Sequence, residues 1–131
     1  DQKERHHQAA KNLIKKLVEQ NVTLLISGLV LDEVWHTIMV KAKLNNLSQK
    51  DLRQRIRSVN QAWSKMPWLK MVRLNANLED HFQVADLMAQ YGLRPRDSYH
   101  LKLSLDQQAN FFATFDHDFD HLFKAKVLQP A

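Results

Sequence analysis

Residues 22–26 have the sequence VTLLI, and Ser27 follows them directly. This run is short, β-branched and almost continuously apolar, as is typical of a strand buried on both faces. Ser27 can cap a helix that then runs from residue 28 to about residue 43. A buried strand followed at once by a helix is the repeating unit of an α/β fold with a parallel sheet.

Amphipathic helices are predicted on both sides of this strand. Apolar residues recur at helical spacing over residues 5–19 and 78–91, and again behind Ser48, a second plausible N-cap. Gly92 is expected to end the helix that precedes it. Residues 71–74 are a weaker strand candidate.

The segment at residues 97–105 allows two interpretations. Residues 101–105 alternate with period two, which alone would permit a strand, but Asp97 and Ser98 can cap a helix there. We therefore predict a helix.

Two further strands complete the predicted sheet. Residues 110–114, with the sequence NFFAT, are expected to form a second buried strand, and residues 126–128 a last edge strand. Strands alternating with helices predict a helix-rich, three-layer α/β/α fold with a short parallel sheet. We expect a single domain over residues 1–131, since that length is close to the common domain size.

Composition excludes several kinds of chemistry. The 131 residues include no cysteine and two glycines, so a disulfide framework, a thiolate zinc site and a glycine-rich phosphate loop are all excluded. The formal net charge of +5 favours an anionic partner such as nucleic acid. No apolar run is long enough for a membrane span and no secretory leader is recognisable, so we expect a cytoplasmic protein.

Acidic residues follow the predicted strands at several points along the chain. Glu33 lies in the helix after the first strand, Asp97 at a helix start, and Asp116 and Asp118 just after residues 110–114. Because these places meet at one edge of a parallel sheet, the carboxylates are expected to converge. A cluster of carboxylates suits Mg²⁺ or Mn²⁺, which prefer oxygen ligands.

Three segments in the same order resemble the downstream motifs of the PIN domain family: SGLVLDEV at 27–34, LRPRDSYH at 93–100 and FATFDHDF at 112–119. RHHQAA at 5–10 looks like the segment after the first strand in VapC-type toxins of bacterial toxin–antitoxin pairs. The resemblance implies an Mg²⁺- or Mn²⁺-dependent endoribonuclease that is the toxin of a type II pair.

The resemblance also assigns roles to residues. It makes Glu33, Asp97 and Asp116 the catalytic acids of the metal site, Asp118 a further metal ligand and Thr114 a supporting hydroxyl. One departure concerns the beginning of the chain. The family starts with a strand that ends in a metal-binding Asp, whereas Asp1 directly precedes a helix here, so we expect the sequence to lack that strand.

Basic residues are expected to bind the substrate. Arg94 and Arg96 flank Asp97 and could clamp a phosphate near the scissile bond. A basic stretch at residues 41–57 could hold the RNA backbone, chiefly through Lys43, Arg53 and Arg57. The implied partners are an RNA substrate and a cognate antitoxin, and apolar residues on the helices around this stretch suggest a homodimer.

Three alternatives stay open at this point. A catalytically inactive PIN-like module could bind RNA or protein, and an all-helical DNA-binding domain would require residues 22–26 and 110–114 to be helical. His117 and His121 could share one helical face and bind zinc, although no third protein ligand is evident.

Overall fold

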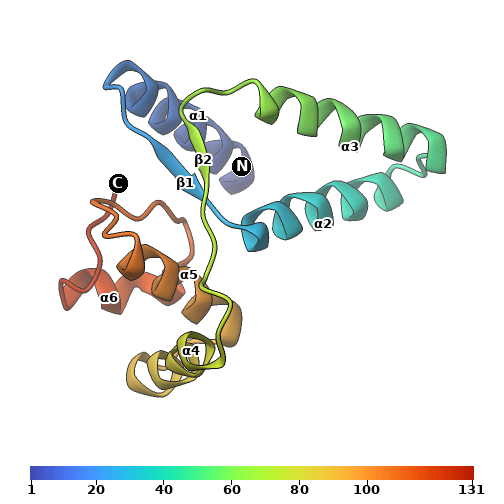
Figure 1. Cartoon of the computed structure of the whole chain (residues 1–131). Helices are drawn as coiled ribbons and strands as arrows, with labels where there is room; N and C mark the ends of the chain where they lie inside the picture. The colour runs from blue at the N-terminus through green and yellow to red at the C-terminus, as the bar shows by residue number, and fades with distance from the viewer. The chain divides into compact units, whose positions relative to one another are not determined.

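The computed structural model describes residues 1–131, and its elements group into two units that we describe separately. The hairpin unit comprises residues 21–72, and the core unit comprises residues 1–20 together with 73–131. Figure 1 shows the elements of both units in chain order.

A short parallel sheet lies at the base of the hairpin unit. Strand β1 (Leu24–Ile26) pairs with β2 (Leu69–Met71), so that Leu24 lies opposite Leu69 and Ile26 opposite Met71. Two backbone bonds of 2.8 Å extend the pairing, from Leu24 N–H to the carbonyl of residue 68 and from residue 72 N–H to the Ile26 carbonyl. This sheet confirms the predicted strand at residues 22–26, while the second strand begins two residues earlier than expected.

Two helices connect the strands. Helices α2 (Gly28–Leu44) and α3 (Gln49–Ser64) form a helical hairpin that leads from β1 back to β2 (Figure 1). The Ser48 hydroxyl accepts a hydrogen bond from Asp51 N–H, as expected of an N-cap. Ser27 occupies the N-cap position of α2, but its side chain makes no capping hydrogen bond.

The core unit is helical. Its elements are α1 (Gln2–Glu19), α4 (Leu78–Tyr91), α5 (Pro95–Asp106), the 3₁₀ helix η1 (His117–Phe119) and α6 (Asp120–Lys124). Gly92 ends α4 with φ of 62°, a left-handed conformation that glycine adopts without strain. The helix predicted at residues 97–105 is confirmed as part of α5.

The main hydrophobic core belongs to this unit and joins α4, α5, η1 and α6. Its buried members are Leu93, Leu101, Phe119, Leu122 and Leu128. Phe112 packs against them, with its ring centroid 4.9 Å from that of Phe119. The segments that carry Asp97 and Asp116 therefore rest on one shared core.

The strand predicted at residues 110–114 is wrong. Phe112 makes only an isolated parallel bridge with Pro130, and Phe111 is exposed, so the run is not buried on both faces. The bridge consists of two hydrogen bonds, from Phe112 N–H to the Gln129 carbonyl at 2.8 Å and from Ala131 N–H to the Phe112 carbonyl at 3.3 Å, and it does not continue as a ladder. The edge strand predicted at residues 126–128 is also wrong, because Lys126 adopts φ of 58° and interrupts an extended run.

A helix-rich α/β fold with a short parallel sheet is nevertheless confirmed. The all-helical alternative is excluded, because residues 24–26 form a strand and residues 110–114 are not helical. None of the helices combines the length and apolar character that a membrane crossing requires.

Candidate metal centre

Asp97 is held by the start of α5. Pro95 occupies the first turn of this helix, where its missing N–H is not needed, and Asp97 follows two residues later. The next residue, Ser98, is fully buried, and its hydroxyl donates a 2.9 Å hydrogen bond to the Val84 carbonyl of α4. This bond fixes α5 against α4 and so fixes the position from which Asp97 projects.

Asp116 and Asp118 are held by a single tight turn. Asp116 is the N-cap of η1, and its Oδ1 accepts a 2.9 Å bond from Asp118 N–H. Asp116 N–H donates in turn to the Thr114 hydroxyl, also at 2.9 Å. Phe119 at the end of η1 is 3% exposed, so the core anchors the turn that presents both carboxylates.

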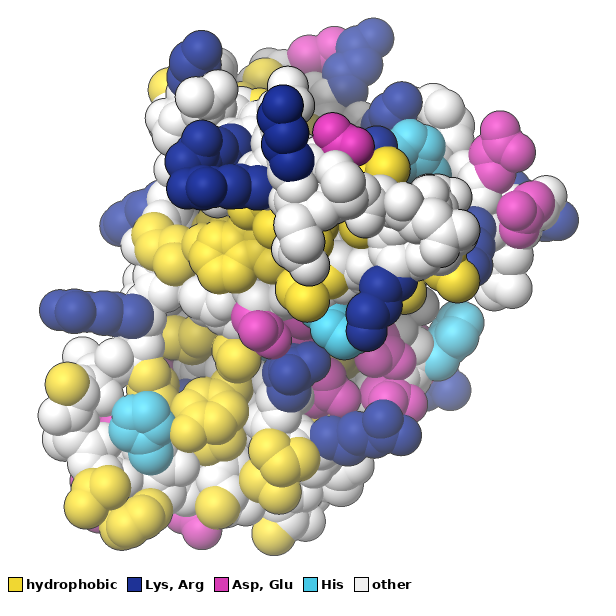
Figure 2. All heavy atoms as spheres, turned by 90° about the vertical axis from the view of Figure 1, so that its right-hand side faces the viewer, with side chains coloured by type: hydrophobic (Ala, Val, Ile, Leu, Met, Phe, Trp, Pro, Cys, Tyr) yellow, Lys and Arg dark blue, Asp and Glu magenta, His cyan; other side chains and the backbone are white.

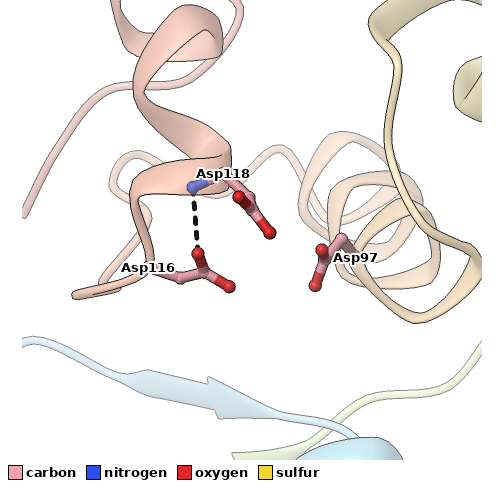
Figure 3. A group of neighbouring side chains, drawn as sticks. All are labelled: Asp97, Asp116 and Asp118. Carbon is pink, nitrogen blue, oxygen red and sulfur yellow. Dashed lines mark hydrogen bonds between the residues drawn. The ribbon is translucent and has the colours of Figure 1, made fainter.

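These elements bring three carboxylates together. One carboxylate oxygen from each of Asp97, Asp116 and Asp118 lies within 4.8 Å of the other two. Figure 3 shows the three side chains facing a common space from α5 on one side and from the η1 turn on the other. We call this group the acidic cluster.

The charges in the acidic cluster perturb one another. Burial raises the pKa of the Asp97 carboxyl above its usual value, and the negative charges of Asp116 and Asp118 raise it further. The positive charges of His100 and Arg94 act in the opposite direction on the same pKa. Repulsion among neighbouring carboxylates is the condition that a bound cation relieves.

The donor set fits a hard divalent cation. All three side chains offer oxygen, and two of them are exposed, which leaves room for the waters that Mg²⁺ and Mn²⁺ retain. No cysteine is available to select a softer metal. Asp97, Asp116 and Asp118 are therefore the residues that would hold Mg²⁺ or Mn²⁺.

The other predicted metal ligand lies in the hairpin unit. Glu33 belongs to α2 and is half-buried there. Its membership of the acidic cluster stays a prediction. Thr114 was predicted as a supporting hydroxyl, and its hydroxyl accepts a hydrogen bond from Asp116 N–H.

The predicted phosphate-binding arginines begin α5. Arg94 is its N-cap residue and Arg96 lies in its first turn, and both are exposed. Arg94 acts on Asp97 through its charge, so it lies within electrostatic reach of the acidic cluster. Lys43, Arg53 and Arg57 are exposed on the helices of the hairpin unit.

The imidazoles of His117 and His121 have different partners. His117 Nδ1 lies 3.0 Å from an Asp120 carboxylate oxygen, whereas His121 Nε2 lies 2.6 Å from the Tyr91 carbonyl oxygen. Each imidazole is thus engaged with a different partner. The pair offers no support for the zinc alternative.

One contact beside the acidic cluster was missed at the level of sequence. The ring of His6 in α1 stacks on Phe115, with centroids 4.9 Å apart and planes inclined by 5°. The two residues are far apart in the chain, and no local pattern links them. The only sequence signal is the position of Phe115 next to Asp116.

Comparison with known proteins identifies the family. The model of the PIN domain family matches residues 2–124, which include all three members of the acidic cluster. Searches of curated proteins and of solved structures returned no significant match. PIN domains generally have a nuclease-type fold. The match spans nearly the whole sequence, and this chain belongs to the PIN domain family.

Proposed function

We propose that this protein is an Mg²⁺- or Mn²⁺-dependent endoribonuclease that hydrolyses RNA phosphodiester bonds and serves as the toxin of a type II toxin–antitoxin pair. The observation that carries the proposal is the acidic cluster, in which three carboxylates of a PIN domain lie within 4.8 Å of one another. No side chain with a nucleophilic role is required by this chemistry.

The mechanism assigns separate tasks to the residues around the cluster. Asp97, Asp116 and Asp118 would hold the cation, and Glu33 is proposed as an additional acid. When bound, the cation supplies Lewis-acid activation of water and stabilises the charge that develops on the phosphate. Arg94 and Arg96 orient the scissile phosphate from the start of α5, because guanidinium groups bind phosphate oxygens in a bidentate manner.

The hairpin unit contributes a basic surface to the proposal. Arg53 and Arg57 are one helical turn apart on α3, so they share a face of that helix, and Lys43 lies on α2. Lys and Arg side chains are exposed at many places on the face drawn in Figure 2, several of them in its upper part. Lys43, Arg53 and Arg57 are exposed in the hairpin unit. These residues would hold the RNA backbone through its phosphates.

The proposal extends to protein partners and to the compartment. A toxin needs a cognate antitoxin, and a homodimer would cover part of the apolar surface that the chain exposes. On α2 this surface comprises Trp35, Met39, Val40 and Leu44, of which Leu44 is 77% exposed. The compartment that suits such a toxin is the cytoplasm.

RNA cleavage by the purified protein tests the proposed activity. We expect cleavage of a mixed RNA pool with Mg²⁺ or Mn²⁺ and none with EDTA. Asp97→Asn is expected to lower the rate by about a hundredfold or more, because even supporting partners of metal ligands are worth about 10- to 100-fold. Asp86→Asn is the matched control, since Asp86 is an exposed acid of α4 outside the acidic cluster.

Two results would contradict the proposal. One is equal cleavage by the wild type and by Asp97→Asn. The other is cleavage that persists undiminished in EDTA. Binding of RNA by the wild type without any cleavage would instead favour the inactive RNA-binding module.

A further inference from the structure

The stacked pair of His6 and Phe115 has no role in the activity proposed so far. Phe115 is 47% exposed, whereas Phe112, three residues earlier, packs into the core of the same unit. Phe112 thus anchors this segment to the core. Exposing about half of a second phenylalanine forgoes the stabilisation that burial would give.

The two rings of the pair are stacked. The His6 and Phe115 rings are almost parallel, with an inclination of 5° and a centroid separation of 4.9 Å. Offset parallel stacking of this kind is favourable between aromatic rings. His6 therefore holds the exposed Phe115 ring in one orientation, which lowers the entropy lost when a third ring stacks nearby.

The position of the pair relates it to the acidic cluster. Phe115 directly precedes Asp116, and one residue spans only about 3.5 Å of backbone. His6 and Phe115 both belong to the core unit, as do all three members of the cluster. A nucleotide with its phosphate at the cluster would have an aromatic pair close to its base.

We infer that the stacked pair of His6 and Phe115 is a platform on which an unpaired base of the RNA stacks, next to the phosphate that is cleaved. This inference rests on the proposed function and specifies its substrate as RNA that is single-stranded at the cut. Sequence-specific proteins commonly recognise such splayed bases by stacking them on aromatic side chains. Phe115 is the base-contacting residue, and His6 is a positioning residue that acts through it.

The test measures stacking directly and does not depend on cleavage. A set of short single-stranded RNAs carries the fluorescent base 2-aminopurine at each position in turn, and Asp97→Asn is the common background so that the strand stays intact. We expect protein binding to quench the fluorescence at one or two positions. Phe115→Leu should abolish this quenching and weaken RNA binding about 5- to 10-fold, in line with the value of one stacked base.

Matched variants separate stacking from loss of an apolar side chain. Phe115→Trp should retain the quenching, because an indole ring stacks at least as well. His6→Ala should weaken the quenching and His6→Phe should restore it, a rescue that only a ring at this position explains. Phe111→Leu is the control, since Phe111 is 53% exposed in the same segment and does not precede an acid of the cluster.

The possible outcomes distinguish this inference from the proposed function. Quenching that depends on Phe115, in a protein whose wild type cleaves no RNA, would support the platform and overturn the nuclease. Cleavage by a wild type whose quenching is unchanged by Phe115→Leu would overturn the platform alone. Absence of quenching at every position, or an equal effect of Phe111→Leu, would also overturn it.

Discussion

At the scale of single residues, Asp97 is a side chain whose ionisation the candidate metal centre disfavours. Its pKa is raised by burial and by the charges of Asp116 and Asp118. A carboxyl whose pKa is raised by folding favours the folded state when protonated, so its contribution to stability is lost as the pH rises through the raised pKa. In the absence of a cation, ionisation of Asp97 in the acidic cluster therefore lowers the free energy of unfolding.

Asp97→Asn should therefore stabilise the protein in EDTA. The amide carries no charge, so the free energy of unfolding near pH 8 is expected to rise by about 1 kcal/mol or less, the usual range for partly exposed charges. The gain should shrink as the pH falls toward the ordinary carboxyl pKa of 3.8. Urea unfolding curves across this pH range measure it.

Asp86→Asn controls for the loss of one negative charge. Its effect on the free energy of unfolding should be smaller, because Asp86 lies outside the acidic cluster. A destabilised Asp97→Asn protein near pH 8 in EDTA would mean that Asp97 makes a favourable interaction that outweighs the repulsion.

Sequence reasoning found the acids but not the stacked pair, and the difference has a physical reason. Asp97 was predicted at a helix start, and Asp116 and Asp118 after a strand that does not form, yet the segments that carry them rest on one core. The contact between His6 and Phe115 joins residues more than a hundred positions apart. Only tertiary packing creates it, so no local pattern in the sequence could predict it.

At the scale of elements, two serines at equivalent helix starts behave differently. Ser48 Oγ accepts a 3.1 Å bond from Asp51 N–H at the start of α3. Ser27 precedes α2, yet its hydroxyl is buried and has no hydrogen-bond partner. Both positions match the sequence rule for an N-cap, but only Ser48 provides the stabilising contact.

Alanine substitutions should separate the two serines. Ser48→Ala is expected to lower the free energy of unfolding by about 1 kcal/mol, the usual value of an N-cap bond. Ser27→Ala should be close to neutral or slightly stabilising, because it removes a buried hydroxyl that gains nothing in the folded state. Thermal and urea unfolding of the two variants in parallel measure the difference. Equal destabilisation by both substitutions would show that the Ser27 hydroxyl has a partner in solution.

The segment at residues 110–114 shows where local patterns fail for a whole element. Its apolar composition is that of a strand, and the backbone is indeed extended enough for a bridge at Phe112. A strand also needs a series of paired residues, and here the pairing is confined to the two hydrogen bonds that Phe112 makes with Gln129 and Ala131. In contrast, α5 forms despite its alternating residues, because Pro95 and the buried Ser98 favour a helix that packs on α4.

At the scale of the whole molecule, opposite charges serve different tasks in the proposed nuclease. The net charge is +5, but the two signs of charge are proposed to act in different units. The acidic cluster belongs to the core unit, whereas Lys43, Arg53 and Arg57 belong to the hairpin unit. Phosphate contacts made by the basic residues would be independent of base identity. Their contribution should then appear in the salt dependence of RNA binding and not in sequence preference.

The double variant Arg53→Ala/Arg57→Ala tests this division. Each phosphate contact to a single strand contributes about 0.7 to the slope of log Kd against log salt, so losing two contacts should lower the slope by about 1.4. Fluorescence anisotropy of a labelled single-stranded RNA in EDTA, where no cleavage occurs, gives Kd over a range of salt concentrations. Lys11→Ala/Lys15→Ala is the matched control, because it removes the same charge from exposed positions one turn apart on α1. An equal change in slope for both double variants would mean that only the net charge of the protein matters, which would contradict the proposal. A change confined to the α3 variant would identify this helix as the surface that holds the RNA backbone.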